Sequence, residues 1–206
     1  MKDFKIVWSA RSECGPNRKK NEDTIFPPIS GSSKPLFKAA VCDGLGGHVN
    51  GDVASKIAAD TLLKEITDLN QIITEANKNI LEYQEKDPSS LGMGTTMTAI
   101  SIDSDALMKI GHVGDSRCYV LSDRNLIKVT EDQNVPGYQN VLKQALGSNE
   151  KLNIQEVDFQ LQIGDVVFLC SDGLYNEVGE EYIKKKMQDG ISADTCLLYT
   201  SPSPRD

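Results

Sequence analysis

Residues 95–130 read TTMTAISIDSDALMKIGHVGDSRCYVLSDRNLIKVT, and this stretch decides the fold. It contains four short runs rich in aliphatic and β-branched residues, each bounded by polar residues or glycine. Ser122–Asn125 is typical of the tight turn that joins two neighbouring strands. The pattern therefore predicts an antiparallel meander, with strands at Thr95–Ile102, Leu107–Val113, Cys118–Leu121 and Leu126–Thr130.

Further strands and helices flank the meander in groups. We expect strands at Phe4–Ala10, where apolar residues recur at every second position, and at Leu36–Cys42. Apolar residues recur at helical spacing from Val53 to Ile66 and from Leu69 to Tyr83, which predicts two amphipathic helices. Grouping of this kind is typical of the α+β class, with mostly antiparallel sheets covered by helices. Later in the chain we expect a short helix at Gln139–Leu146, strands at Ile154–Phe159 and Val166–Cys170, and a helix at Glu180–Met187.

The composition indicates one ordinary folded domain. The chain has 206 residues, of which 39% are hydrophobic and 25% charged, enough for a sizeable core. Its 30 acidic and 22 basic residues give a net charge of −8, which repels nucleic acid and attracts divalent cations. Met1–Lys20 lacks the apolar stretch of a signal peptide, and no later run is long enough to span a bilayer. We expect a cytoplasmic protein that binds neither nucleic acid nor membrane.

The five cysteines are not expected to carry chemistry. Their number is odd, and no two have the close spacing of zinc ligands. Cys42, Cys118 and Cys170 lie in apolar, strand-like runs, where a thiol acts as a small hydrophobic group.

Three apolar runs end in turns that contain an aspartate beside a glycine. These turns hold Asp43 before Gly44, Asp115 after Gly114, and Asp172 before Gly173. One such turn is usually structural, because both residue types are favoured in turns. Three at the strand ends of one small domain can place their carboxylates on one rim, where the charges repel unless cations bridge them. An all-oxygen ligand set predicts magnesium, manganese or calcium in preference to zinc.

A fourth candidate lies near the N-terminus, where Arg18-Lys-Lys-Asn-Glu22-Asp23 joins basic residues to two carboxylates. The segment fits a solvated loop. It also fits a site in which Arg18 binds a phosphate through its planar guanidinium while Glu22 and Asp23 hold metal-bound waters. The two histidines, His48 and His112, are expected to be structural. Dinucleotide-binding, phosphate-loop and helix-loop-helix calcium motifs do not occur in the sequence.

Taken in order, these segments resemble the type 2C, metal-dependent serine/threonine protein phosphatases in their compact bacterial form. The resemblance covers roughly residues 9–187. Each matching piece is weak alone, and five in the right order make a strong match. The pieces are Arg18–Asp23, Val41–His48 with Gly51, Ala54 and Ser55, Gly94–Thr96, Gly114–Arg117, and Ser171–Gly173.

The resemblance implies a four-layer α-β-β-α sandwich in which two antiparallel sheets are flanked by helices. It implies two or three Mn²⁺ or Mg²⁺ ions and hydrolysis of phosphoserine and phosphothreonine in proteins by a metal-activated bridging water. Asp43 would bridge two metals, the Gly44 carbonyl would bind one of them, and Asp172 would bind the other. Asp115 would join a third, weaker site. Arg18 would bind the phosphate, and Glu22 and Asp23 would act largely through bound waters.

The chain departs from the family pattern in two places. Leu45 occupies the position where animal members have a histidine proposed as general acid, so that leaving-group protonation would fall to water. The family also closes with an Asp-Asn segment that completes one metal site, and nothing after Asp172 matches it. We therefore expect a phosphatase domain at residues 1–190 that is incomplete at its C-terminus, and a tail at residues 191–206 that is disordered or foreign to the domain. Weaker metal binding would follow.

Two alternatives remain open. One is a non-catalytic, phosphatase-like module that binds metal or a phosphorylated partner. The other is a calcium-stabilised structural domain, which gives Arg18 no role. The sequence leaves open the physiological substrate, the opposing kinase, the choice between manganese and magnesium, and the oligomeric state.

Overall fold

The computed structural model describes residues 4–15, 18–45, 50–148 and 151–190. Its helices are α1 (Gly51–Thr61), α2 (Leu69–Lys86) and α3 (Asp172–Gln188), and a short 3-10 turn follows α2 at Pro88–Ser90. Among these residues, no helix is both long and apolar enough to cross a membrane.

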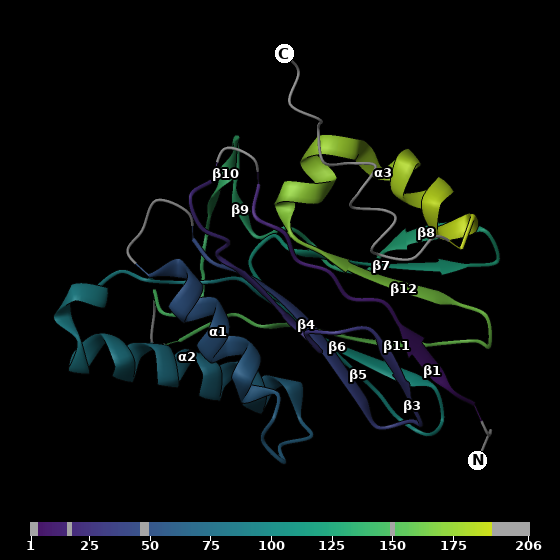
Figure 1. Cartoon of the computed structure of the whole chain (residues 1–206), viewed down its shortest axis with the longest axis horizontal. Helices are drawn as coiled ribbons and strands as arrows, with labels where there is room; N and C mark the ends of the chain where they lie inside the picture. Colours follow the sequence, from purple (N-terminus) through teal and green to yellow (C-terminus); the bar gives the residue numbers. More distant parts are fainter. Residues whose placement is uncertain (1–3, 16–17, 46–49, 149–150, 191–206) are drawn as a thin grey trace.

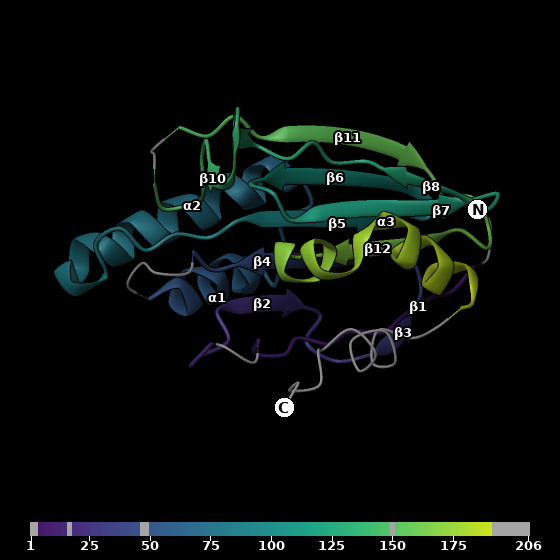
Figure 2. The ribbon, with the colours of Figure 1, turned by 90° about the horizontal axis from the view of Figure 1, so that it is seen from above.

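The largest sheet has five antiparallel strands in the order β11-β6-β5-β4-β2, which Figure 2 shows side by side. A second sheet has the order β12-β7-β8, and two short pairs, β1-β3 and β10-β9, complete the strands of the described residues. The strand bounds are β1 Ile6–Trp8, β2 Asp23–Phe26, β3 Gly31–Ser33, β4 Phe37–Asp43, β5 Met97–Ile102, β6 Leu107–Val113, β7 Arg117–Ser122, β8 Asn125–Lys128, β9 Asn134–Val135, β10 Tyr138–Leu142, β11 Gln155–Gln160 and β12 Val166–Cys170.

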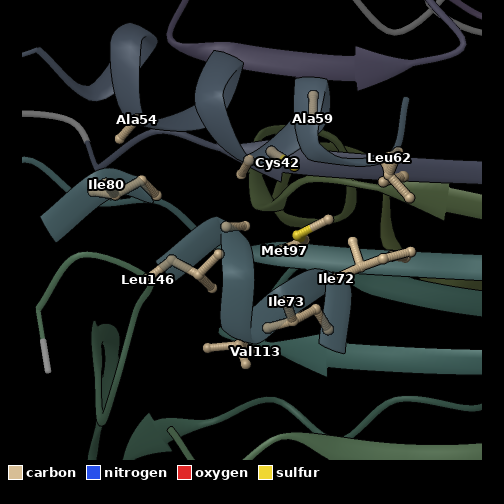
Figure 3. Packing of buried hydrophobic residues seen from close by; sticks show 14 of the residues in the cluster. Cys42, Ala54, Ala59, Leu62, Ile72, Ile73, Ile80, Met97, Val113 and Leu146 are labelled. Carbon is tan, nitrogen blue, oxygen red and sulfur yellow. The ribbon is translucent and has the colours of Figure 1, made fainter. Parts of the chain in front are cut away.

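Helices α1 and α2 cover one face of the five-stranded sheet (Figure 1). Ile72, Ile73 and Ile80 of α2 are completely buried in the cluster between helices and sheet, together with Met97 and Val113 of the strands (Figure 3). Burying each such side chain contributes about 1.5–3 kcal/mol. This cluster fixes β4, and with it the strand end that carries Asp43.

The opposite face of the large sheet packs against the second sheet. Ile100 and Ile110 of the large sheet share a buried cluster with Cys118 and Val120 of β7. Helix α3 covers the outer face of the second sheet, where Ile183 is almost fully buried. Figure 1 shows α3 on the side of the molecule opposite α1 and α2.

The sequence-based expectations are confirmed for the α+β class, for the four strands expected between Thr95 and Thr130 and for the first two helices. The three cysteines expected in the interior are buried, and Cys14 is exposed. The strand expected at Phe4–Ala10 is shorter, since β1 spans Ile6–Trp8.

Two expectations were wrong. The short helix predicted at Gln139–Leu146 is instead strand β10, which pairs with β9 across a turn at Pro136 and Gly137. Gly137 has φ +82°, a left-handed conformation that glycine adopts without strain. The four strands expected as one meander are divided between two sheets, with β5 and β6 in the five-stranded sheet and β7 and β8 in the second sheet. The helix expected at Glu180–Met187 is confirmed as the second part of α3, which begins at Asp172 and is interrupted at Gly179, where φ is 71° and ψ is 162°. The tail expected at 191–206 lies outside the described residues.

Candidate metal and phosphate site

Asp43 and Asp23 meet at the edge of the five-stranded sheet. Asp43 ends β4, Asp23 begins β2, and the two residues are direct partners in the antiparallel register. Directly opposed residues present their side chains on the same face of a sheet. The backbone of Asp43 is fixed by the two residues that precede β5, because its N–H donates to Thr96 Oγ1 at 3.0 Å and its carbonyl accepts from Thr95 Oγ1 at 2.9 Å.

Asp172 lies just after β12, a strand of the second sheet. It lies two residues after the end of β12 and is the first residue of α3, a position where the helix dipole favours a carboxylate. The preceding residue, Ser171, donates a 2.7 Å hydrogen bond from Oγ to Oδ2 of Asp23. The two sheets are therefore joined at the carboxylate cluster itself.

Burial and mutual repulsion control the protonation of this cluster. Burial, reinforced by the negative charges of Asp23 and Asp172, raises the pKa of Asp43 to about 9. Burial also raises the pKa of Asp23, against the hydrogen bond from Ser171 and the attraction of Arg18, which lower it. Without a cation the site therefore retains a proton at neutral pH. A divalent cation supplies the positive charge that these carboxylates lack.

Asp115 lies beside this cluster, in the turn between β6 and β7, and is 7% exposed. Burial raises its pKa to about 6; the hydrogen bond from Asn134 Nδ2 to Oδ2, at 3.2 Å, opposes the rise, and the charge of Asp172 adds to it. Gly114, with φ +110°, shapes the turn, and a Cβ there would lie 2.6 Å from Thr96 Cβ. Asp115 is therefore held close to Asp172 but outside the Asp23–Asp43 pair.

Arg18, Glu22 and Gly44 complete the expected set. Arg18 is exposed at the rim of a cleft that is also lined by Asp23, Asp43, Asp115 and Asp172. Glu22 lines the same cleft, and its Oε1 lies near Gly51, at the start of α1. Gly44 is buried at a point where three segments of the backbone come close together. A Cβ at this position would lie 2.4 Å from the Gly51 carbonyl oxygen and 2.6 Å from the Glu22 carbonyl oxygen. The close approach requires glycine at position 44.

The histidines do not enter the described site. His112 is fully buried and bonded to Thr98 Oγ1 at 2.8 Å and to the Glu131 carbonyl at 3.1 Å, which agrees with the structural role expected for it. His48 lies outside the described residues.

The donor chemistry of the site fits a hard divalent cation. Carboxylate and backbone carbonyl oxygens are the ligands that Mg²⁺ and Mn²⁺ prefer. In the described part of the chain, no group of three His, Cys, Asp or Glu side chains already has the spacing of a closed metal site. The residues suited to hold a cation are the neighbouring carboxylates Asp23, Asp43 and Asp172, with Asp115 next to them.

Sequence reasoning missed the residues that hold these ligands in place. Ser171 donates a hydrogen bond to the side chain of Asp23. Asn134 donates to the side chain of Asp115, and Tyr175 donates to the backbone carbonyl of Asp115. The supporting role of Ser171 could have been predicted, because Ser171 directly precedes Asp172 in a strand-end motif. The other two come from segments without a motif of their own.

A family model described as protein phosphatase 2C matches residues 16–193 of the chain. The chain belongs to the protein phosphatase 2C family. It is accordingly a metal-dependent protein serine/threonine phosphatase of the 2C type.

Bacterial members of the protein phosphatase 2C family are similar over most of the chain. The serine/threonine phosphatase stp of Listeria monocytogenes is 33% identical over 221 residues, which cover 91% of this chain and 86% of that protein. The serine/threonine protein phosphatase PstP of Mycobacterium tuberculosis is 31% identical over 208 residues, 89% of this chain and 39% of PstP.

Solved structures of the family have the same fold. The crystal structure of M. tuberculosis PstP superposes with a TM-score of 0.80 at 26% identity, covering 98% of this chain and 94% of that chain. A second structure, of the PstP catalytic domain, contains two manganese ions and superposes with a TM-score of 0.79 at 26% identity over the same shares.

Proposed function

We propose that this phosphatase hydrolyses phosphoserine and phosphothreonine in proteins phosphorylated by a serine/threonine kinase, in the cleft between Arg18 and the carboxylates Asp23, Asp43 and Asp172. The observation that carries the proposal is the meeting of these carboxylates, from three separate elements, beside an exposed arginine. Carboxylates can hold cations and an arginine can hold a phosphate, so the cleft has both halves of a phosphomonoesterase site.

The cofactors proposed are two Mn²⁺ or Mg²⁺ ions, with a third at a weaker site. Asp43 and the Gly44 carbonyl would hold one, Asp43 and Asp172 the other, and Asp115 would contribute to the third. When bound, such cations activate water as a nucleophile and neutralise charge on the phosphoryl oxygens. Support comes from the raised pKa of Asp43, since a partly buried carboxylate surrounded by others needs either a proton or a cation.

The protein side chains have separate tasks in this proposal. Arg18 would bind the substrate phosphate at the rim, where its guanidinium can offer paired donors. Ser171 would orient Asp23 through its 2.7 Å hydrogen bond. Glu22 and Asp23 would act largely through bound waters, Glu22 from its place beside Gly51. Leu45 offers no proton to a leaving group, so water would supply it.

We also propose that residues 1–190 form one catalytic domain with the four-layer α-β-β-α arrangement. Three separate buried clusters support this, one between α1, α2 and the five-stranded sheet, one between the sheets, and one under α3.

The test is metal-dependent hydrolysis of p-nitrophenyl phosphate and of a phosphothreonine peptide. The purified chain is stripped with chelator and assayed before and after addition of Mn²⁺ or Mg²⁺, with Asp158→Asn, an exposed acidic residue on β11, as the matched control for variants of the carboxylate cluster. We expect activity to vanish with chelation and return with metal in both the wild type and the control. Hydrolysis that survives chelation unchanged, or is absent at every metal concentration, would overturn the proposal.

A further inference from the structure

We propose that Tyr175 is a positioning residue, which sets the place of the Asp115 turn relative to Asp172 and thereby the strength of metal binding at Asp115. The inference rests on the proposed function, since it assigns a residue that supports the same site.

Tyr175 joins the two structural elements that carry these aspartates. It lies on the first turn of α3, three residues after Asp172, and is 8% exposed. Its hydroxyl donates a buried 3.1 Å hydrogen bond to the backbone carbonyl of Asp115. One side chain therefore ties the start of the helix that presents Asp172 to the turn that presents Asp115.

The ring of Tyr175 is itself held by Arg117. The guanidinium carbon lies 3.5 Å from the ring centroid, within the range of a cation–π interaction. Arg117 cannot easily leave this place, because Nε and Nη2 donate to the carboxylate of Asp132 at 3.0 Å and 2.6 Å. Its Nη1 donates to the hydroxyl of Tyr119 at 3.1 Å.

The second half of α3 closes the network. The helix is interrupted at Gly179, and the next residue, Glu180, accepts a 3.1 Å hydrogen bond from Tyr119 and lies 3.7 Å from Arg117 Nη1. Arg117 is thus held between Asp132 on one side and Glu180 on the other. Tyr175 is therefore held at two places, by the Arg117 guanidinium on the face of its ring and by the Asp115 carbonyl at its hydroxyl.

This arrangement bears on metal binding because cation sites depend on ligand placement. A binding constellation works when its residues are held within about 0.5 Å of the productive geometry by supporting hydrogen bonds and packing. The side chain of Asp115 is bonded to Asn134, and its backbone is bonded to Tyr175. Loss of the Tyr175 hydroxyl frees the backbone of the turn while leaving the side-chain contact in place.

The deciding variant is Tyr175→Phe, which removes the hydroxyl and keeps the ring under Arg117. Tyr182→Phe removes a hydroxyl from the same helix, at a ring that lies 5.2 Å from the Lys186 ammonium, and is the matched control.

Manganese is titrated into each chelator-treated protein by calorimetry without substrate, and the manganese concentration for half-maximal hydrolysis of p-nitrophenyl phosphate is measured separately. For Tyr175→Phe we expect the weaker class of manganese sites to lose affinity by roughly two- to tenfold, the usual effect of one hydrogen bond. The half-maximal manganese concentration should rise by a similar factor, while kcat at saturating manganese stays within about twofold of the wild type.

A merely structural tyrosine would lower the melting temperature and leave the manganese titration unchanged, and that result overturns the inference. Should Tyr175→Phe fold poorly, Arg117→Lys loosens the ring from the other side and is expected to weaken the same class of sites. An inactive wild type with an intact difference in the calorimetric titration would contradict the proposed function alone. If the wild type is active and both tyrosine variants bind manganese as tightly as the wild type does, only the role of Tyr175 is contradicted.

Discussion

Asp23 and Asp43 stand directly opposite each other across the antiparallel pair of β2 and β4. Like charges at such a position destabilise a sheet, and here both residues are partly buried, which raises the pKa of each carboxyl. The fold accepts this repulsion at a place where two strand ends, the start of α3 and the exposed Arg18 come together. The cost to stability of holding the pair is the basis of the first prediction.

Asp43→Asn should stabilise the metal-free protein at alkaline pH. The pKa of Asp43 is about 9 in the folded protein and 3.8 ordinarily, so that between these values the folded state binds a proton that the unfolded chain has released. Stability from this group is therefore complete below pH 3.8 and is lost as the pH rises toward 9. Asparagine cannot ionise and removes that dependence.

The measurement for Asp43→Asn is the melting temperature in chelator from pH 5 to pH 9. We expect the variant to melt above the wild type at pH 8, with a gain of about 2–4 °C for each kcal/mol, and the gain should shrink toward pH 5. Manganese should raise the melting temperature of the wild type and of the Asp158→Asn control, and have little effect on Asp43→Asn. Melting curves that coincide at every pH would contradict the prediction.

Arg18→Ala should weaken the use of phosphorylated substrates and spare metal binding. Charge-assisted hydrogen bonds to a phosphate contribute about 1.5–3 kcal/mol, which corresponds to roughly a ten- to hundredfold loss in kcat/KM. The measurement is steady-state hydrolysis of a phosphothreonine peptide, with a manganese titration alongside. Lys19→Ala, an exposed neighbour of the same charge, is the control. A kcat/KM equal to that of the control would return Arg18 to the solvated-loop interpretation.

His112 should make the protein less stable in mildly acidic solution. Burial lowers the pKa of this histidine from 6.5 to about 4, so the unfolded chain binds a proton in that window that the folded protein does not. Stability therefore falls as the pH drops from 6.5 to 4, by roughly 3 kcal/mol from this residue. His112→Gln, which cannot take up a proton, should show a smaller loss over the window in urea denaturation. The same slope in the wild type and the variant would contradict the assignment, and His48→Gln serves as the control.

Lys38→Met should destabilise the end of α1. The ammonium of Lys38 donates to the carbonyls of Leu62, Lys64 and Ile66 at 3.0, 3.0 and 2.9 Å. Methionine keeps most of the apolar stem and leaves these three acceptors without the charged donor. We expect a loss of about 1–3 kcal/mol in the free energy of unfolding, measured in urea. Lys34→Met, at an exposed position, should change it by less than about 0.5 kcal/mol.

Much of the fold follows from local patterns in the sequence. Strands β5 to β8 and the first two helices were predicted because their apolar residues face buried clusters, so burial and periodicity agree. Their division between two sheets was missed, because periodicity does not tell which strands pair. The predicted helix at Gln139–Leu146 failed for a local reason. Pro136 and Gly137 form the turn of a hairpin, and the following residues pair with β9 in preference to forming a helix.

The sequence analysis identified the candidate carboxylates, whose metal-binding roles stay predictions, but it missed the residues that support them. Asp43, Asp115 and Asp172 end apolar strands and stand out next to glycine. Strand β2, which places Asp23, was missed because it has only four residues and its pattern shows no alternation. Tyr175 could not be found from its spacing, since its partner Asp115 lies 60 residues away and is bonded through the backbone. Every residue has a backbone carbonyl, so a sequence pattern cannot indicate which one accepts the hydrogen bond.

The bond between Ser171 and Asp23 spans 148 positions of the sequence. On a ribosome that adds roughly 5–20 residues per second, Asp23 therefore waits about 7–30 s for the serine that orients it. During that time the growing chain can build β4, the first two helices and the hairpins β5-β6 and β7-β8, whose contacts are more local and form sooner. The carboxylate cluster is completed only when the second sheet docks against the first. A growing chain that lacks Asp172 also lacks part of the proposed metal site, so we expect it to be inactive until β12 and the start of α3 have been made.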